Sequence, residues 1–365
     1  MKRKNSIVLI IVAVCLVAGG AAFGVLAFTT WGDFNYENSY SYKPSSPSSI
    51  EQININSDIG SVRIRYNETP TDYYAKLDLD IYIAGILVKG SSFSDFFNPI
   101  VWENESTPIT TFILDAKATT WFIFGVFRQI QINLTLRTDV VYDLNILTST
   151  GNINAEISEN TILNNTILST STGNVYLNAL NNITFQGNVG LTTSTGNILF
   201  YAKQGNFTHN LKSFSSTGNM HLNFSTCSIG GDLTGTESTG NIVFNSYNMK
   251  YAEGHNWRFQ SSTGKIGLTI LQYTEMGANI NGSIQSSTGN INIYYKDSLA
   301  TIGAKFTCST STGTKSYVPI DTGGFTVNGA NPKIMISDDY ISAINKYTLT
   351  ATASTGNIIV HGESL

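Results

Sequence analysis

One tripeptide recurs along this chain at a nearly constant spacing. Ser-Thr-Gly occurs nine times, and successive glycines are 22, 23, 22, 22, 24, 25, 24 and 43 residues apart. Asn follows the glycine in seven of the nine copies. Self-similarity at this period indicates a stack of similar units, each of which buries its apolar face against its neighbours. The repeated residues are Gly151, Asn152, Gly173, Asn174, Gly196, Asn197, Gly218, Asn219, Gly240, Asn241, Gly264, Gly289, Asn290, Gly313, Gly356 and Asn357.

Apolar and polar residues alternate directly after each of these glycines. Positions +2 and +4 from the glycine are apolar almost throughout, as in Ile198 and Phe200 or Ile242 and Phe244. Positions −7 and −5 often repeat the pattern. A period of two predicts half-buried strands. We therefore predict an all-β fold, a parallel β-solenoid (β-helix) with about two strands in each 22- to 25-residue coil and its regular part over residues 148–365.

The repeated residues suit a corner between two strands. Gly adopts backbone angles with φ above zero that other residues resist, Ser and Thr hydroxyls bond turn amides, and Asn tolerates the left-handed region. Asn side chains stacked in register can also form an amide ladder along the axis. A catalytic nucleophile needs one activated copy, whereas a corner needs one copy in every coil. We interpret the motif as structural.

The first residues predict a membrane anchor. Lys2, Arg3 and Lys4 precede a run of 22 uncharged residues, Ile7 to Phe28, which is long enough to cross a membrane as a helix. The positive-inside rule places residues 1–5 in the cytoplasm. We expect a single-pass transmembrane signal anchor over residues 6–28, with the rest of the chain extracellular. The Ser/Pro/Tyr-rich segment 29–50 is expected to be a stalk.

Residues 51–147 follow the repeat less closely. Gly60 ends a degenerate first corner, and alternating apolar residues at 77–83 and 130–136 predict further coil strands. Between them lies an irregular, aromatic-rich insertion over residues 84–128. A solenoid end exposes a sheet edge and an open core, so we expect this insertion to be the N-terminal cap. The alternative is a membrane-facing or partner-binding patch.

The last interval between glycines is nearly two periods long. It predicts either a degenerate coil or an insertion between Thr314 and Lys346. Cys227 lies three coils before Cys308, an axial gap of ~14 Å at ~4.8 Å per coil. That distance is too long for a disulfide. We expect two free thiols.

Charge is scarce, and this excludes one class of partner. Asp, Glu, Lys and Arg make up 13% of the residues, against ~25% in typical soluble domains. Polarity comes instead from 37 Asn and 80 Ser and Thr. Beyond the basic tail, 18 basic and 25 acidic residues leave a net charge of −7. A nucleic-acid partner is not expected, because no basic excess is available to neutralise phosphates.

An N-terminal anchor followed by Ser-Thr-Gly-Asn-Ile repeats of about 22 residues resembles the putative adhesin family of bacteria and archaea. The resemblance covers roughly residues 57–360. It implies an exported, membrane-anchored β-solenoid at the cell surface. It carries over no catalytic or binding residues, because the shared residues are corners and core.

Few residues are candidates for catalysis or metal binding. Asp232, Glu253 and His255 fall at similar positions of adjacent coils, but no second basic partner accompanies them. We expect no cofactor, no metal site and no enzymatic activity. Eight Asn-x-Ser/Thr sequons match the number that the composition alone predicts. Asn223 and Asn281 fall at outward positions and are candidate glycosylation sites.

These observations predict a non-enzymatic cell-surface module. We expect it to act in adhesion or as an envelope scaffold, with uncharged polar faces that contact glycans or surface proteins. A polysaccharide-active β-helix enzyme and an accessory protein of envelope-stress sensing are the alternatives.

Overall fold

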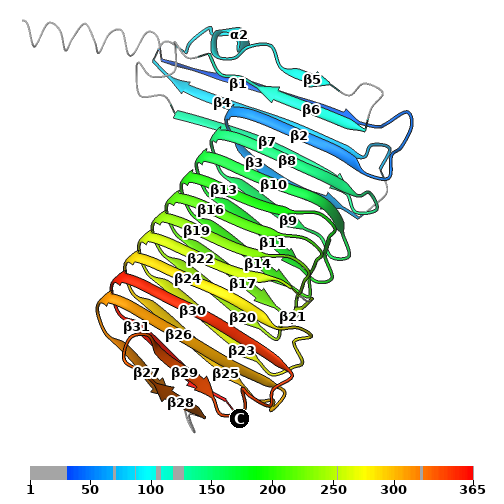
Figure 1. The fold of residues 1–365 in the computed structure, drawn as a ribbon. Coiled ribbons are helices and arrows are strands. Elements are labelled where there is room, and N and C mark those ends of the chain that lie inside the picture. The colour runs from blue at the N-terminus through cyan, green and yellow to red at the C-terminus, as the bar shows by residue number, and fades with distance from the viewer. Residues whose placement is uncertain are drawn as a thin grey trace, which may run out of the picture.

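The computed structural model describes residues 31–68, 71–86, 88–103, 108–117, 127–252, 254–320 and 324–364. In these ranges the chain consists of β-strands, turns and one short helix, α2 (Phe93–Phe96). The strands run mainly parallel in long sheets that stack coil upon coil (Figure 1). The all-β prediction with parallel strands is confirmed.

The predicted anchor over residues 6–28 and the tail 1–5 lie outside the described residues. Among the residues that are described, no helix has the length and apolar character needed to cross a membrane.

Sheet A is one of the two long faces of the stack. It has 13 strands, and each neighbour in the following order is hydrogen-bonded to the next. The order is β1 (Gly32–Tyr42), β4 (Ala75–Gly85), β7 (Phe127–Arg137), β3 (Ser61–Asn67), β9 (Ile153–Ile157), β11 (Val175–Leu180), β14 (Ile198–Lys203), β17 (Met220–Ser225), β20 (Ile242–Tyr247), β23 (Ile266–Gln272), β25 (Ile291–Asp297), β31 (Ile358–Glu363) and β27 (Lys315–Pro319).

Sheet B is the opposite long face. It starts at the N-terminal end with an antiparallel pair and ends with an antiparallel hairpin. Its order is β5 (Val101–Glu103), β6 (Ile109–Leu114), β2 (Glu51–Ile59), β8 (Tyr142–Thr150), β10 (Ile162–Thr172), β13 (Val189–Thr195), β16 (Leu211–Thr217), β19 (Leu233–Thr239), β22 (Asn256–Thr263), β24 (Ile280–Thr288), β30 (Asn345–Thr355), β26 (Ile302–Thr312), β29 (Lys333–Ser337) and β28 (Phe325–Asn328).

A third, very short strand completes each of four middle coils. These two-residue strands pair in parallel with one another and make a narrow third side. Each follows a bend formed by non-glycine residues with φ between 49° and 68°. We predicted about two strands per coil and missed this one, because two residues are too few to show an alternating pattern. The strands are β12 (Thr184–Phe185), β15 (Asn206–Phe207), β18 (Ser228–Ile229) and β21 (Lys250–Tyr251).

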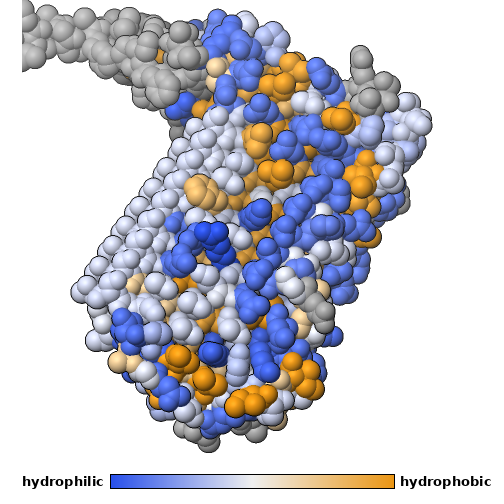
Figure 2. Space-filling model, viewed as in Figure 1, coloured by the Kyte–Doolittle hydropathy of each residue, from blue (hydrophilic) through white to orange (hydrophobic). Residues whose placement is uncertain are grey.

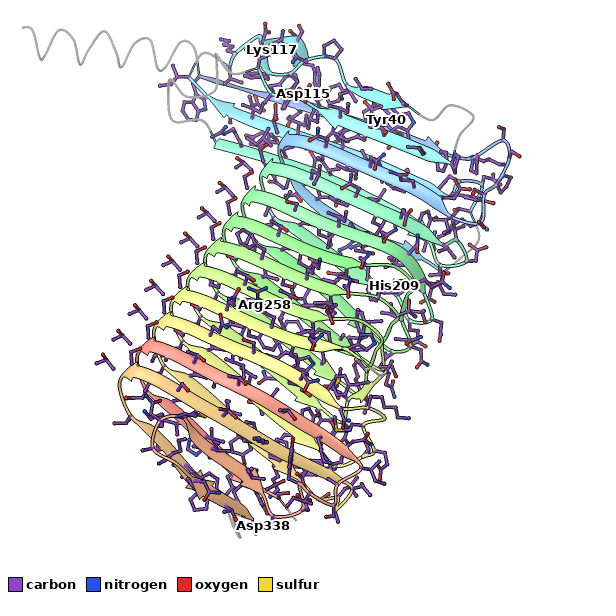
Figure 3. The ribbon with its side chains drawn as sticks, in the orientation of Figure 1. Tyr40, Asp115, Lys117, His209, Arg258 and Asp338 are labelled. Atoms are coloured by element: carbon purple, nitrogen blue, oxygen red, sulfur yellow. The ribbon has the colours of Figure 1, made fainter. Side chains whose placement is uncertain are left out.

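Inward side chains of all three sides form one continuous core along the axis (Figure 3). Large rings stack between coils, with the ring centroids of Phe185 and Phe207 4.9 Å apart and those of Phe224 and Phe244 6.0 Å apart. Cys227 and Cys308 are buried in this core as free thiols, which confirms the expectation for this pair.

The segment 29–50 differs from the predicted stalk. Gly32–Tyr42 is strand β1, which pairs antiparallel with β4 along its whole length. Phe34, Tyr36, Tyr40 and Tyr42 alternate with polar residues and turn toward the core. We expected a stalk because the segment is rich in Ser, Pro and Tyr and showed no apolar periodicity, but aromatic rings supply the apolar side of this strand.

The described part of the aromatic insertion covers the N-terminal end of the core. The ring centroids of Phe34 and Phe96 are 5.3 Å apart, and those of Tyr40 and Trp102 are 5.4 Å apart. Phe97 is fully buried. Tyr40 lies at this end of the molecule in Figure 3. Antiparallel β1, β4 and β7 replace the parallel pattern here, so the stack ends in a different kind of sheet.

The C-terminal coil does not stack in sequence order. β30 lies between β24 and β26, and β31 lies between β25 and β27. The long glycine interval is therefore an insertion that carries β27, β28 and β29, and the last coil then returns into a layer inside the stack. Four coil steps, rather than the three expected, separate Cys227 from Cys308.

Candidate functional site

The nine predicted glycines line one edge of the stack. Their φ angles lie between 139° and 152°. A Cβ atom added to any of them would come within 1.4 to 2.2 Å of the carbonyl oxygen of the corner glycine in the neighbouring coil. No side chain fits there, so these positions require glycine. The edge is the pale band along the left side of Figure 2.

The predicted asparagines hydrogen-bond from coil to coil. The backbone N–H of Asn174 donates to Oδ1 of Asn152, and that of Asn197 donates to Oδ1 of Asn174, both at 2.8 Å. The same bond links Asn219 to Asn197 and Asn357 to Asn290, both at 2.9 Å. Each side chain thus holds the backbone of the next coil, which gives these residues a structural role.

Position −3 from the glycine carries a second, buried ladder, with a hydroxyl in seven of the nine copies, Glu237 in one and Ala353 in the other. Hydroxyl groups at this position donate to the carbonyl oxygen of a corner glycine in the adjacent coil, at 2.9 to 3.3 Å. The residues are Thr148, Thr170, Thr193, Ser215, Ser261, Ser286 and Thr310.

Glu237 takes the place of a hydroxyl in this ladder. The residue is 1% exposed, and neither carboxyl oxygen has a hydrogen-bond partner among the described residues. Burial raises the pKa of the carboxyl to about 7, and the nearby Ser215 hydroxyl and Thr239 amide offset only part of that shift. Every other polar group in the column donates to a glycine carbonyl, and a carboxyl can do so only when protonated.

Of the acidic cluster considered in the sequence, the structure describes Asp232 and His255. The backbone N–H of Asp232 donates to Oδ1 of Asn210, and Oδ1 of Asp232 accepts from the N–H of Asn256, both at 2.9 Å. Glu253 lies outside the described residues, and His255 is half-buried beside it in sequence. Across the described ranges, no three potential ligands are grouped to hold a metal ion.

Asp232 instead belongs to a further ladder that the sequence reasoning missed. Asn165 accepts from the N–H of Asn188 at 3.0 Å in the same way. The members of this ladder are spaced by 22 to 24 residues, as the corner glycines are. That spacing is the signal that could have revealed it, since Asn165, Asn188, Asn210, Asp232 and Asn256 share one phase of the repeat.

The two candidate glycosylation sites differ in access. Asn281 is exposed on β24. Asn223 is half-buried on β17, and its Oδ1 accepts a hydrogen bond from Nδ2 of Asn245.

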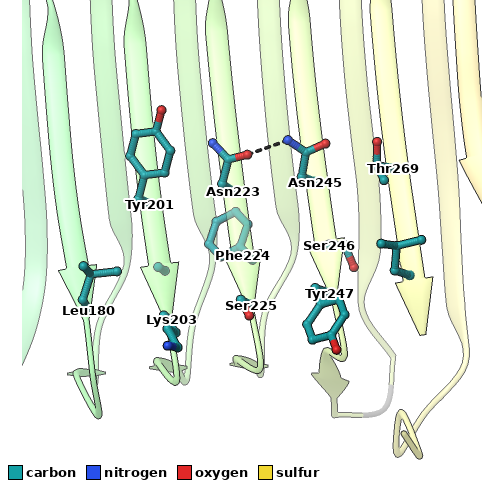
Figure 4. Close-up of a pocket in the computed structure, with 12 residues that line it drawn as sticks. Leu180, Tyr201, Lys203, Asn223, Phe224, Ser225, Asn245, Ser246, Tyr247 and Thr269 are labelled. Carbon is teal, nitrogen blue, oxygen red and sulfur yellow. Dashed lines mark hydrogen bonds between the residues drawn. The ribbon is translucent and has the colours of Figure 1, made fainter. Parts of the chain in front are cut away.

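Asn223 lies in a hollow on the outer face of sheet A (Figure 4). The hollow has a volume of about 320 Å³ and spans β14, β17, β20 and β23. Tyr201, Asn223 and Asn245 lie in one row across three neighbouring strands, and Tyr247 lies two residues after Asn245 on β20 (Figure 4). Binding sites for small molecules start at ~300 Å³ and combine apolar walls with a few polar groups. The hollow meets both criteria.

Comparisons with known proteins give distant matches only. No family model and no curated protein matches the chain. A solved structure of a putative cell adhesion protein from Clostridium sporogenes is 14% identical, covers 90% of this chain and 100% of its own, and has a TM-score of 0.25. A putative adhesin from Bacteroides fragilis is 14% identical, with 90% and 97% covered and a TM-score of 0.38.

Proposed function

We propose that this chain is a β-solenoid module of the cell surface that acts by binding, as an adhesin does, and not by catalysis. The observation that carries the proposal is the hollow on sheet A. It offers aromatic rings, amides and hydroxyls to a partner, and no carboxylate lines it. A hydrolytic or lyase site would need an acid or a base there.

The acidic residue that we first considered for catalysis supports the same proposal. Asp232 already accepts a backbone hydrogen bond in a ladder that also contains asparagines. Asn can fill this role as well as Asp. Asp232→Asn should therefore leave the fold and the binding of partners unchanged. Release of reducing sugar ends from polysaccharides, lost in this variant, would instead favour an enzyme.

The proposed location rests on the first residues of the chain. The basic residues at 2–4 and the uncharged run that follows favour an anchor with its N-terminus in the cytoplasm and the stack outside. Protease treatment of intact cells should digest the stack, and alkaline extraction should leave the chain in the membrane. Deletion of residues 6–28 should release it. Protection from protease in intact cells would overturn the external location.

Adhesion itself is testable with the full chain in detergent, immobilised on beads. Intact cells and purified cell envelopes are the probes, and beads carrying an unrelated detergent-solubilised protein are the control. We expect retention above the control. A truncation that starts at residue 49 is unsuitable, because it would remove β1 and uncover the N-terminal end of the core. No retention at any protein density would overturn the binding function.

A further inference from the structure

The walls of the hollow on sheet A are ring pairs held in place by neighbouring tyrosines. Tyr201 packs on Tyr176 with ring centroids 5.9 Å apart, and Tyr247 packs on Tyr273 at 6.0 Å. Tyr247 still leaves 42% of its surface exposed. Exposed apolar surface costs ~25 cal/mol per Å² relative to burial. Rings that are fixed by a neighbouring ring but remain exposed to solvent are suited to bind the apolar face of a ligand. Little side-chain entropy is lost on binding, because the rings are already ordered.

The floor of the hollow is a polarised pair of amides. Nδ2 of Asn245 donates to Oδ1 of Asn223. This bond leaves the Nδ2 group of Asn223 as a donor toward the Tyr201 side, and Oδ1 of Asn245 as an acceptor toward the Thr269 side (Figure 4). A ligand with several hydroxyl groups satisfies both ends, because each hydroxyl can donate and accept.

The charge of the lining residues restricts the class of ligand that can bind. The twelve residues that line the hollow include no carboxylate, and Lys203 is their one charged side chain. A cationic ligand would find no counter-charge, and a polyanion would find a single lysine on an exterior of net charge −7. The lining is complementary to a ligand without charge.

We propose that the hollow binds a neutral oligosaccharide, with sugar rings stacked against Tyr201 and Tyr247 and hydroxyl groups bonded to Asn223 and Asn245. Pyranose rings combine an apolar C–H face with a rim of hydroxyls, and the hollow offers both complements. Tyr201 and Tyr247 lie on strands separated by β17, so their backbones are ~10 Å apart across the strands. Tyr247 also lies two residues further along its strand than Asn245, which is level with Tyr201, so the ligand runs diagonally across the strands. This inference rests on the proposed binding function and names its ligand.

The test uses the full chain in detergent, produced without glycosylation. The probes are neutral gluco-, manno-, galacto- and chito-oligosaccharides, on an array and then in titration calorimetry. We expect at least one series to bind, Tyr247→Ala to weaken binding at least tenfold, and Asn245→Leu to do the same. Tyr294→Ala is the matched control, because this ring is 38% exposed on β25 of the same face but outside the hollow. It should change affinity less than twofold.

Each outcome separates this inference from the proposed function. Adhesion that persists unchanged in a folded Tyr247→Ala chain overturns the oligosaccharide site and leaves the binding function standing. Oligosaccharide binding that depends on Tyr247, without retention of cells or envelopes, supports the site and overturns adhesion. No binding by any of the four series overturns the inference. A glycan found on Asn223 of the natural protein also overturns it, because the occupant would then be the chain's own sugar.

Discussion

The stack turns at two kinds of corner that both use positive φ but differ in what they tolerate. At the Ser-Thr-Gly corner φ is near 150° and a carbonyl oxygen of the neighbouring coil lies where a Cβ would be. At the opposite corner, Gln204, Thr226 and Asn248 adopt φ of 55°, 52° and 49°. The left-handed region is accessible to such residues at a modest cost. Close approach between backbones, rather than positive φ alone, thus makes the first corner invariant.

Gly218→Ala tests whether the Ser-Thr-Gly corner tolerates a side chain, and it should have the largest effect. The new Cβ would lie 1.8 Å from the carbonyl oxygen of Gly196, and φ of 151° is a region that L-residues avoid. The backbones of two coils must separate, so we expect a loss of more than ~3 kcal/mol in the free energy of unfolding. Chemical denaturation measures it. A loss below ~1 kcal/mol would show that the close approach is not what fixes the residue.

Glu237→Thr tests the buried ladder behind the same corner. The folded pKa of Glu237, about 7, lies above the ordinary value of 4.5. Its contribution to stability is therefore fully present below pH 4.5 and is lost as the pH rises through about 7. The wild-type melting temperature should fall between pH 5 and pH 8, and Glu237→Thr should remove that part of the fall. Thermal unfolding across this range measures it.

Glu237→Gln is the matched control for this effect, because its amide donates at every pH. Glu237→Gln should reduce the fall in melting temperature between pH 5 and pH 8, as Glu237→Thr does. An identical pH profile in wild type and both variants would contradict protonation of Glu237 in the folded state.

A smaller loss is expected when one regular step of the ladder is removed. Thr193 is buried and donates to the carbonyl oxygen of Gly173 at 2.9 Å. Thr193→Val keeps the shape and removes the hydroxyl, which should cost ~1 kcal/mol. Denaturant titration measures the change. Thr192→Val, on the outer face of the same strand, is the control and should be nearly neutral. Equal losses in the two variants would argue against a role for the bond.

The smallest effect is predicted at the tolerant corner. Thr226 is a β-branched residue at φ of 52°, whereas the neighbouring coil has Asn248 in the same place. Thr226→Asn should raise the free energy of unfolding by ~0.5 kcal/mol, because Asn adopts the left-handed conformation at a lower energetic cost than Thr. Differential scanning calorimetry can resolve the corresponding rise. A decrease of more than ~1 kcal/mol would remove the contrast between the two corners.

The features that could be predicted from the sequence are those that depend on a local pattern of apolar and polar residues. Alternation after each glycine identifies the inward residues of sheet A, and Phe200 and Phe244 are fully buried as their positions predict. The same alternation puts Tyr201, Asn223 and Asn245 at outward positions of successive coils, so the row that lines the hollow could have been found. What could not be found is its concavity, which depends on the size of each neighbouring side chain.

The stacking order of the last coils could not be predicted from the sequence for a different reason. Gly356 contacts the carbonyl of Gly289, and Gly313 contacts that of Gly356. All three are Ser-Thr-Gly corners with the same local geometry, so nothing in the motif says which stacks on which. β1 was missed because Asn38 interrupts the alternation of its inward aromatic residues and a Ser- and Pro-rich run follows the strand.

The returning C-terminal coil makes earlier layers of the stack depend on residues that are synthesised later. β24 and β26 are made earlier, but both pair with β30 rather than with each other. Ser364, at the end of the described chain, donates to the buried carboxylate of Asp297 at 3.1 Å. A chain that stops before residue 345 lacks the strand that pairs with both β24 and β26, and the strand that pairs with both β25 and β27. A chain cut before residue 345 should therefore be digested by proteases faster than a chain that includes β30 and β31.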